Sequence, residues 1–368
     1  MTSLLLALLA CSTDATKDTT TDTAPDTADT GPVERDPTAV IVTSDYTVGT
    51  LSTSTLGGAV TADLLPVSGD TVVVGEGSRL FLLDRVANVV RAYDNGDLTA
   101  PAWETNVGEG ANPTSVATCG GKVFVARCFI PSLLVLDPAT GLSVGEVDLS
   151  AFDDGDGSPE ADSLVVAPNG KLYASLNQLD FVNTYASADG SGTLVEVDCA
   201  TNAVSDSWEV GPNPHVAAIG DGSTLAVYGG DYFLPDYSGP ALDGGLWTFD
   251  TETATLTATA LTDEGVGGNV GNVVINADGK GLLTIDDGSV WSVGCFDLTS
   301  GTTTATFDPA AYVQQAALAP DGSVWLVQRS PFSGEAGTVG TVRVDLATCT
   351  PAAPIATTLE PYAVTFVE

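Results

Sequence analysis

A phrase that occurs six times along the chain constrains its fold more than any other feature. Each copy is a short apolar run that ends in an aspartate and continues into Thr, Ser, Gly or Asn. The aspartates lie 47 to 61 residues apart, at Asp84, Asp137, Asp198, Asp250, Asp297 and Asp345. An aspartate side chain can accept hydrogen bonds from N–H groups two or three residues further on. The phrase therefore predicts a strand that ends in a tight turn, and we interpret all six aspartates as structural.

A second phrase places Gly after Ser, Gly, Asn or Asp between two β-rich runs, as in residues 167–174 (APNGKLYA). Such dipeptides favour the positive φ of tight hairpins. Each unit therefore reads as four short strands, and residues 39–368 show no sustained helical period. The six expected units are 63–107, 112–150, 160–211, 213–264, 268–309 and 311–358.

The remaining runs complete a seventh unit. Residues 360–368 match the first strand of a unit, and three runs between residues 38 and 64 match the other three. A unit built from both chain ends closes a ring and removes open sheet edges. The fold class is therefore predicted as all-β, a seven-bladed β-propeller with about 47 residues per blade.

The phrases VLDPATG (135–141) and APDGSVWLV (319–327) resemble those of the YVTN-type and quinoprotein-like seven-bladed propellers of bacterial envelopes. The resemblance covers most of residues 39–368, but its motifs concern blade folding. The superfamily includes lactonases, dehydrogenases and non-enzymatic binding proteins, so it implies the fold and leaves the activity open.

The N-terminal region predicts export. Residues 1–11 form a short apolar run that ends in Leu8-Leu9-Ala10-Cys11, which resembles the lipobox of bacterial lipoproteins, with Cys11 as the acylated residue. No Lys or Arg precedes the run, and an incidental apolar N-terminus is the alternative. Residues 12–38 are rich in Thr, Asp and Pro and have almost nothing to bury, which predicts a disordered spacer. The domains are thus 1–11, 12–38 and the propeller, 39–368, held at the bacterial cell envelope by a lipid anchor.

Charge excludes several classes of partner. The chain has 11 Lys and Arg against 48 Asp and Glu, a net charge of −37, which repels nucleic acid and anionic lipid. A single histidine rules out a His-rich zinc site. We expect a monomer that contacts the membrane only through its anchor and binds a protein or a small molecule.

The long connections are expected on one face of the propeller. They join the second strand of a blade to the third, or one blade to the next, and in a four-stranded blade both kinds of loop lie on the same face. Binding residues are often found on such loops. The long loops carry six aromatic residues that either contact a ligand or pack the loops themselves: Phe181, Tyr185, Tyr232, Phe233, Tyr237 and Phe332.

A ring of polar residues is predicted where the innermost strands reach that face. Its members are Ser115, Ser163, His215, Asn272, Gln315 and Tyr362, with Asp162 just above them. Polar groups that converge on a concavity suit a small ligand. A hydrated channel in which these groups hold water is the alternative.

Residues 153–160 (DDGDGSPE) resemble a calcium loop, with oxygen donors at alternate positions: Asp154, Asp156, Ser158 and Glu160. The loop lacks the flanking helices and final Glu of an EF-hand, and a solvated acidic turn is the other interpretation. Calcium is the one cofactor that the sequence suggests.

Catalysis has little support in the sequence. No G-x-S-x-G elbow accompanies His215, and no nucleotide-binding fingerprint is present.

Of the five cysteines after Cys11, at least one must stay unpaired, and Cys119 and Cys199 fall on neighbouring hairpin turns where they could pair. The sequence favours a binding or scaffolding module that acts through its long-loop face. The alternative is a lactonase-like, metal-dependent hydrolase at the channel mouth, with oxygens from Asp162, Asn213 and Asn272.

Overall fold

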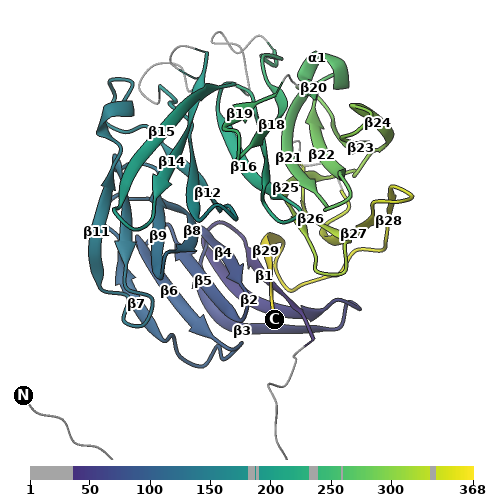
Figure 1. Ribbon diagram of the computed structural model, residues 1–368. Helices are drawn as coiled ribbons and strands as arrows, with labels where there is room; N and C mark the ends of the chain where they lie inside the picture. The colour runs from purple at the N-terminus through teal and green to yellow at the C-terminus, as the bar shows by residue number, and fades with distance from the viewer. Residues whose placement is uncertain (1–35, 181–186, 188–189, 232–238, 258–259, 332–336) are drawn as a thin grey trace, which may run out of the picture. The chain divides into compact units, whose positions relative to one another are not determined.

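The computed structural model describes residues 36–180, 187, 190–231, 239–257, 260–331 and 337–368. Residues 36–368 form a ring of seven antiparallel blades, each with four strands in radial order (Figure 1). The fourth strand of blade 4 is split in two. The predicted all-β propeller is therefore confirmed. No helix among the described residues is long and apolar enough to cross a membrane.

The strands of blades 1 to 3 are β4 (Thr71–Glu76), β5 (Arg79–Asp84), β6 (Val89–Asp94) and β7 (Trp103–Asn106); β8 (Pro113–Cys119), β9 (Lys122–Arg127), β10 (Ser132–Leu136) and β11 (Ser143–Asp148); and β12 (Ala161–Val166), β13 (Lys171–Leu176), β14 (Gly192–Asp198) and β15 (Ala203–Val210). A 3-10 turn, η1 (Ser150–Phe152), follows β11.

The strands of blades 4 to 6 are β16 (Pro214–Ile219), β17 (Thr224–Gly229), β18 (Gly245–Asp250), β19 (Thr255–Leu256) and β20 (Leu261–Thr262); β21 (Asn269–Ile275), β22 (Lys280–Asp286), β23 (Trp291–Asp297) and β24 (Thr302–Phe307); and β25 (Tyr312–Leu318), β26 (Val324–Arg329), β27 (Gly340–Asp345) and β28 (Thr350–Pro351). A single helical turn, α1 (Asp263–Val266), follows β20.

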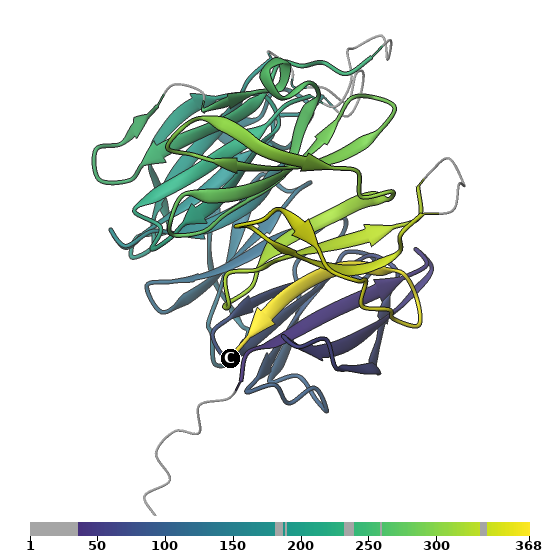
Figure 2. The ribbon, with the colours of Figure 1, turned by 90° about the vertical axis from the view of Figure 1, so that its right-hand side faces the viewer.

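The closing blade joins the two ends of the propeller. Its strands run in the order β29 (Pro361–Val367), β1 (Thr38–Ser44), β2 (Val48–Thr55) and β3 (Val60–Ser68). The last strand of the chain pairs antiparallel with β1 (Figure 2). The predicted seventh unit, shared between the chain ends, is confirmed.

The fold gives the propeller two distinct faces. We call the side that carries the second-to-third-strand loops and the blade-to-blade connections the mouth face. The opposite side, which carries the first-to-second-strand hairpins and the third-to-fourth-strand turns, is the hairpin face. Strand β1 begins and β29 ends on the hairpin face, so the chain enters the propeller opposite the mouth face.

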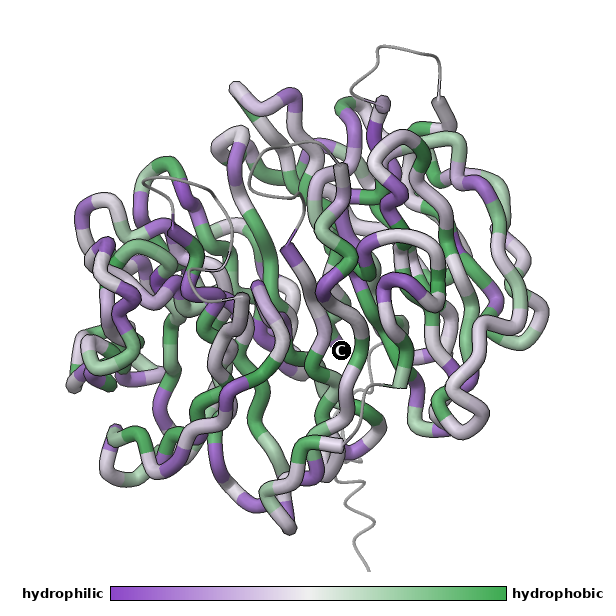
Figure 3. Tube along the Cα trace, turned by 90° about the horizontal axis from the view of Figure 1, so that it is seen from above, coloured by the Kyte–Doolittle hydropathy of each residue, from purple (hydrophilic) through white to green (hydrophobic). Residues whose placement is uncertain are grey.

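The hydrophobic core lies between blades. Seven clusters of buried apolar side chains occur, and each one spans one of the seven interfaces between neighbouring blades. Apolar residues recur along the strands, whereas many connections are hydrophilic (Figure 3). Removal of apolar surface from water thus holds each blade to its neighbours and supports a rigid ring.

Disulfides reinforce two of these interfaces. Cys119 and Cys199 join blades 2 and 3 across a Cα distance of 5.8 Å, as the sequence predicted. A second bridge, Cys295–Cys349, joins blades 5 and 6 and was not predicted. Among the described cysteines Cys128 is free, and it is buried.

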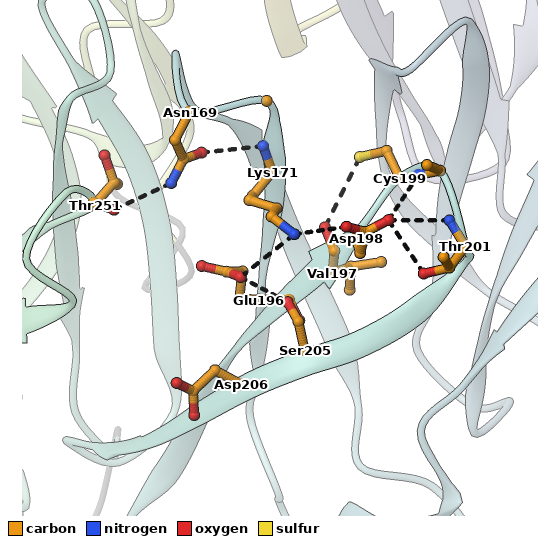
Figure 4. A network of polar contacts seen from close by, with 12 residues as sticks. Asn169, Lys171, Glu196, Val197, Asp198, Cys199, Thr201, Ser205, Asp206 and Thr251 are labelled. Carbon is orange, nitrogen blue, oxygen red and sulfur yellow. Dashed lines mark hydrogen bonds and ion pairs between the residues drawn. The ribbon is translucent and has the colours of Figure 1, made fainter.

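Five of the six repeated aspartates end or directly follow a third strand. Asp198 shows the arrangement: its Oδ1 accepts hydrogen bonds from the N–H groups of Ala200 and Thr201, both 3.0 Å long (Figure 4). Its other oxygen accepts from Lys171 Nζ at 2.6 Å. The hydrogen bond from Lys171 and those from Thr201 hold the pKa of Asp198 far below its ordinary value.

The sixth aspartate, Asp84, corrects the predicted first unit. It ends β5, a second strand, so the turn after it lies on the mouth face. The predicted unit 63–107 treated Ser68-Gly69 as a hairpin, but these residues lie at the connection between the closing blade and blade 1. The first hairpin of blade 1 is Gly77-Ser78.

Candidate functional site

The six polar residues predicted to form a ring all lie on the first strands of their blades, and each one contacts a neighbouring blade or its connection. The contacts are Leu164 N to Ser115 Oγ (3.3 Å), Val216 N to Ser163 Oγ (2.8 Å), His215 Nδ1 to Asp162 Oδ2 (2.6 Å), Asn272 Nδ2 to Val313 O (3.5 Å), Val364 N to Gln315 Oε1 (2.7 Å) and Tyr362 Oη to Asp70 Oδ1 (2.7 Å). The ring therefore joins blades as well as lining the channel. Side chains held this way form a pre-organised wall.

A cavity of about 290 Å³ opens at this wall. Five of the predicted residues line it: Ser115, Asp162, Ser163, Gln315 and Tyr362. Thr114, Gln314 and Arg85 also line it and were not predicted. His215 reaches the cavity through Asp162, and Asn272 is not among the lining residues.

Arg85 supplies the cationic group of the cavity wall. It follows Asp84 in the short loop after β5, and its Nη1 lies 3.6 Å from Asp70 Oδ1. Its Nε is buried and has no hydrogen-bond partner among the described residues. The side chain as a whole is about a quarter exposed and lines the cavity, so a ligand acceptor there can meet its guanidinium group. Sequence reasoning missed Arg85 because it placed Asp84 on the opposite face.

Asp162 and His215 form a charged pair beside the cavity. Burial opposes the charge on both groups, but their mutual attraction and hydrogen bond outweigh it, lowering the pKa of Asp162 and raising that of His215. Their mutual attraction therefore favours the charged form of both groups. The imidazole also stacks on Tyr228, with ring centroids 5.5 Å apart.

Two neighbouring groups have structural roles. Burial, followed by the negative charges of Asp162 and Glu160, raises the pKa of the Cys128 thiol to about 12, so it is no nucleophile at neutral pH. Asn213, predicted as a metal donor, accepts from Asn177 Nδ2 at 2.7 Å, and its own amide nitrogen donates to a backbone carbonyl.

The bases of two long loops are fixed by buried polar contacts. Asp231 Oδ1 accepts hydrogen bonds from the backbone N–H and the hydroxyl of Ser187, at 2.9 and 3.0 Å, which joins the loops of blades 3 and 4. Asp263 is fully buried and accepts from the N–H groups of Gly244 and Val270, each at 2.9 Å. The six predicted loop aromatics lie outside the described residues: Phe181, Tyr185, Tyr232, Phe233, Tyr237 and Phe332.

The acidic loop between blades 2 and 3 is arranged differently from the predicted ligand set. Asp154 and Asp156 come together with Asp153, with one carboxylate oxygen of each within 4.8 Å of the others. Ser158 instead donates to the carbonyl of Cys128 at 2.6 Å, and Glu160 Oε2 accepts from the N–H of Leu179 at 2.9 Å.

Comparisons with known proteins show the fold. No protein-family model and no curated protein matches this sequence. Among solved structures, a candidate 6-phosphogluconolactonase from Bacteroides fragilis is 14% identical, with a TM-score of 0.61 over 92% of this chain and 100% of that one. A second candidate 6-phosphogluconolactonase, from Bacteroides uniformis, is 16% identical, with a TM-score of 0.60 over 90% and 100%. Apo AztD from Citrobacter koseri is 14% identical, with a TM-score of 0.54 over 90% and 98%. At these identities the likeness concerns the propeller alone.

Proposed function

We propose that this protein is a lipid-anchored, extracytoplasmic binding module that holds a small polar molecule at the channel mouth. The observation that carries the proposal is the cavity of about 290 Å³, walled by side chains whose positions are fixed through contacts between blades. A concave site with a few convergent polar groups on a rigid scaffold is typical of small-ligand binding.

The charges at the cavity indicate the class of ligand. Arg85 is the cation that lines the cavity, and it lies beside Asp70, while Asp162 faces His215. These charges are balanced within the wall, and the protein's net charge of −37 disfavours anions. A neutral, hydroxyl-rich molecule such as a sugar or a sugar lactone therefore fits better than a phosphorylated one.

Binding can be measured by calorimetry with a panel of neutral monosaccharides and sugar γ-lactones, alongside their phosphorylated forms. We expect at least one neutral compound to bind, and Arg85→Gln to weaken it tenfold or more, the cost of about one charged hydrogen bond. Lys280→Gln, which removes an exposed cation at the hairpin face, is the control and should bind normally. Failure of the whole panel, or equal affinity in Arg85→Gln, would contradict the proposal.

The anchor follows from the predicted lipobox. We expect Cys11→Ala to move the protein from the membrane fraction to the soluble fraction. An unchanged distribution would exclude lipidation at this residue.

A lactonase-like hydrolase is the second candidate function, and the Asp162–His215 pair favours it. A histidine oriented by a carboxylate can, once it is neutral at a pH above its raised pKa, accept a proton from water as that water attacks a lactone carbonyl, which opens the ring to a hydroxy acid. Hydrolysis of a sugar γ-lactone that is lost in His215→Gln would support this function. Loss in the presence of EDTA would identify the metal-dependent form, whereas binding without turnover would leave the binding module.

A further inference from the structure

β-Bulges recur on the innermost strands of the propeller, close to the mouth face. In five of the seven blades the pairing between the first and second strands shifts by one residue. The shifts lie near the start of β8, β12, β21, β25 and β29, whereas β4 and β16 pair in regular register. Bulges are common next to binding sites, where they redirect a side chain. Their repetition at one level of the ring therefore singles out the side chains that they contain.

The bulged strands supply polar side chains to the cavity wall. Three of them contribute pairs of consecutive polar residues that line the cavity: Thr114 and Ser115, Asp162 and Ser163, and Gln314 and Gln315. The regular strand β4 lines the same cavity with valines alone, at residues 72–74. At a bulge two residues oppose a single residue of the partner strand, so consecutive side chains can reach the same side. The polar groups of these strands are thus concentrated at the bulges.

The second residue of each pair joins its blade to the next one. The side-chain oxygens of Ser115, Ser163 and Gln315 each accept a hydrogen bond from a backbone N–H group of the following innermost strand. The donors are Leu164 at 3.3 Å, Val216 at 2.8 Å and Val364 at 2.7 Å. Because this contact holds the second residue, the first residue of each pair has a defined position in the wall.

The first residues of the three pairs differ in how their hydrogen-bonding groups are used. Thr114 Oγ1 donates to the carbonyl of Ala161 at 2.9 Å, and Asp162 Oδ2 lies 2.6 Å from His215 Nδ1. The half-buried Gln314 makes no side-chain hydrogen bond within the part of the chain that the structure describes. A glutamine amide has two N–H donors and one carbonyl acceptor. Gln314 therefore offers both kinds of group to a ligand in the cavity.

We propose that Gln314 determines which ligand the cavity accepts, by binding two neighbouring hydroxyl groups of a neutral sugar or sugar lactone. This inference rests on the binding function proposed above. One hydroxyl accepts a hydrogen bond from the amide N–H, and its neighbour donates one to the amide carbonyl. A compound that lacks either hydroxyl leaves a polar group of the wall without a partner, which lowers its affinity.

The test is calorimetric titration of the full chain with D-glucose, D-galactose, D-mannose and D-ribono-γ-lactone, followed by deoxy forms of the compound that binds most tightly. Gln314→Leu removes the amide and should weaken binding tenfold or more. Removal of one of the two hydroxyls should weaken binding to the wild type by a similar factor. The same removal should change binding to Gln314→Leu by less than about twofold, because the partner of that hydroxyl is already absent.

Asn106→Leu is the matched control, since it also replaces an amide by leucine, at an exposed residue of β7 that does not line the cavity. It should bind as the wild type does. Should Gln314→Leu fail to fold by circular dichroism, Gln314→Ala provides the same comparison. A wild type that binds none of the four compounds would overturn the binding function and this inference together. Binding that Arg85→Gln weakens and Gln314→Leu leaves unchanged, or equal effects of every deoxy form on wild type and Gln314→Leu, would overturn this inference alone.

Discussion

Two sets of acidic residues, one in the repeated turns of the hairpin face and one at least partly buried at the mouth face, have opposite environments. On the hairpin face, turn residues such as Asp137 and Asp250 are half-buried, and hydrogen bonds to their carboxylates lower their pKa. The donors are the Thr140 hydroxyl and backbone N–H groups for Asp137, and backbone N–H groups for Asp250. On the mouth face, burial raises the pKa of Asp154, Asp263 and Glu160. The direction of the pKa shift thus distinguishes the aspartates of the repeated turns from acidic residues that occur once in the propeller. The turn aspartates build blades, whereas Asp154, Asp263 and Glu160 are retained despite a cost in desolvation.

The largest effect is expected at the base of the long loops. Asp263→Ala would leave the buried N–H groups of Gly244 and Val270 without an acceptor. We expect it to lower the free energy of unfolding by about 2–4 kcal/mol, since each unsatisfied buried donor costs about 1–3 kcal/mol. Urea unfolding measures this free energy. A smaller loss in Asp263→Ala than in a variant of a turn aspartate on the hairpin face would contradict the contrast between the two sets.

A pH-dependent effect is expected at Glu160. Its folded-state pKa of about 8 lies above the ordinary value of 4.5, so the folded state binds more protons than the unfolded state between these values. Stability of the calcium-free protein should therefore fall as pH rises from 4.5 to 8, and Glu160→Gln should remove about 1–3 kcal/mol of that fall. Urea unfolding at pH 5 and pH 8 in EGTA tests this; parallel pH profiles for variant and wild type would contradict it.

The smallest effect is expected at a single turn. Asp250→Ala removes a side chain that accepts from the N–H groups of Glu252 and Thr253 in an exposed turn. Water can replace these bonds, so the expected loss in the free energy of unfolding is smaller than for Asp263→Ala or for the pH-dependent term of Glu160. Asp250→Asn, which can still accept these bonds, should recover most of it. A loss equal to that of Asp263→Ala would show that exposure does not set the cost.

The sequence was sufficient for the fold because the propeller repeats its turn chemistry. Gly-containing hairpins and aspartate-ended third strands recur at nearly even spacing, and the leftover strands at the two ends predicted the closing blade. The prediction failed locally at Ser68-Gly69, where a connection between blades carries the same residues as a hairpin. Turn propensity is local and does not say which strands the turn joins.

The candidate site was predictable only in part. Aligning the sequences of the innermost strands of the blades located Ser115, Ser163, Gln315 and Tyr362. This works because the position of a residue along such a strand decides which end of the channel its side chain lies near. It could not show that Arg85 lines the cavity, since this depends on how neighbouring blades pack. It also could not show that Glu160 accepts a hydrogen bond from the N–H of Leu179, because side-chain direction in an irregular loop follows from contacts made by the folded chain.

The central claim, a charged Asp162–His215 pair beside the cavity, can be tested through the single histidine of the chain. A nuclear magnetic resonance titration of the full chain, labelled at histidine and without a histidine tag, follows His215 alone. We predict a pKa above 6.5 in the wild type, because the attraction of Asp162 outweighs burial, and a fall to or below 6.5 in Asp162→Asn. A wild-type value at or below 6.5, or one that Asp162→Asn leaves unchanged, would contradict the account.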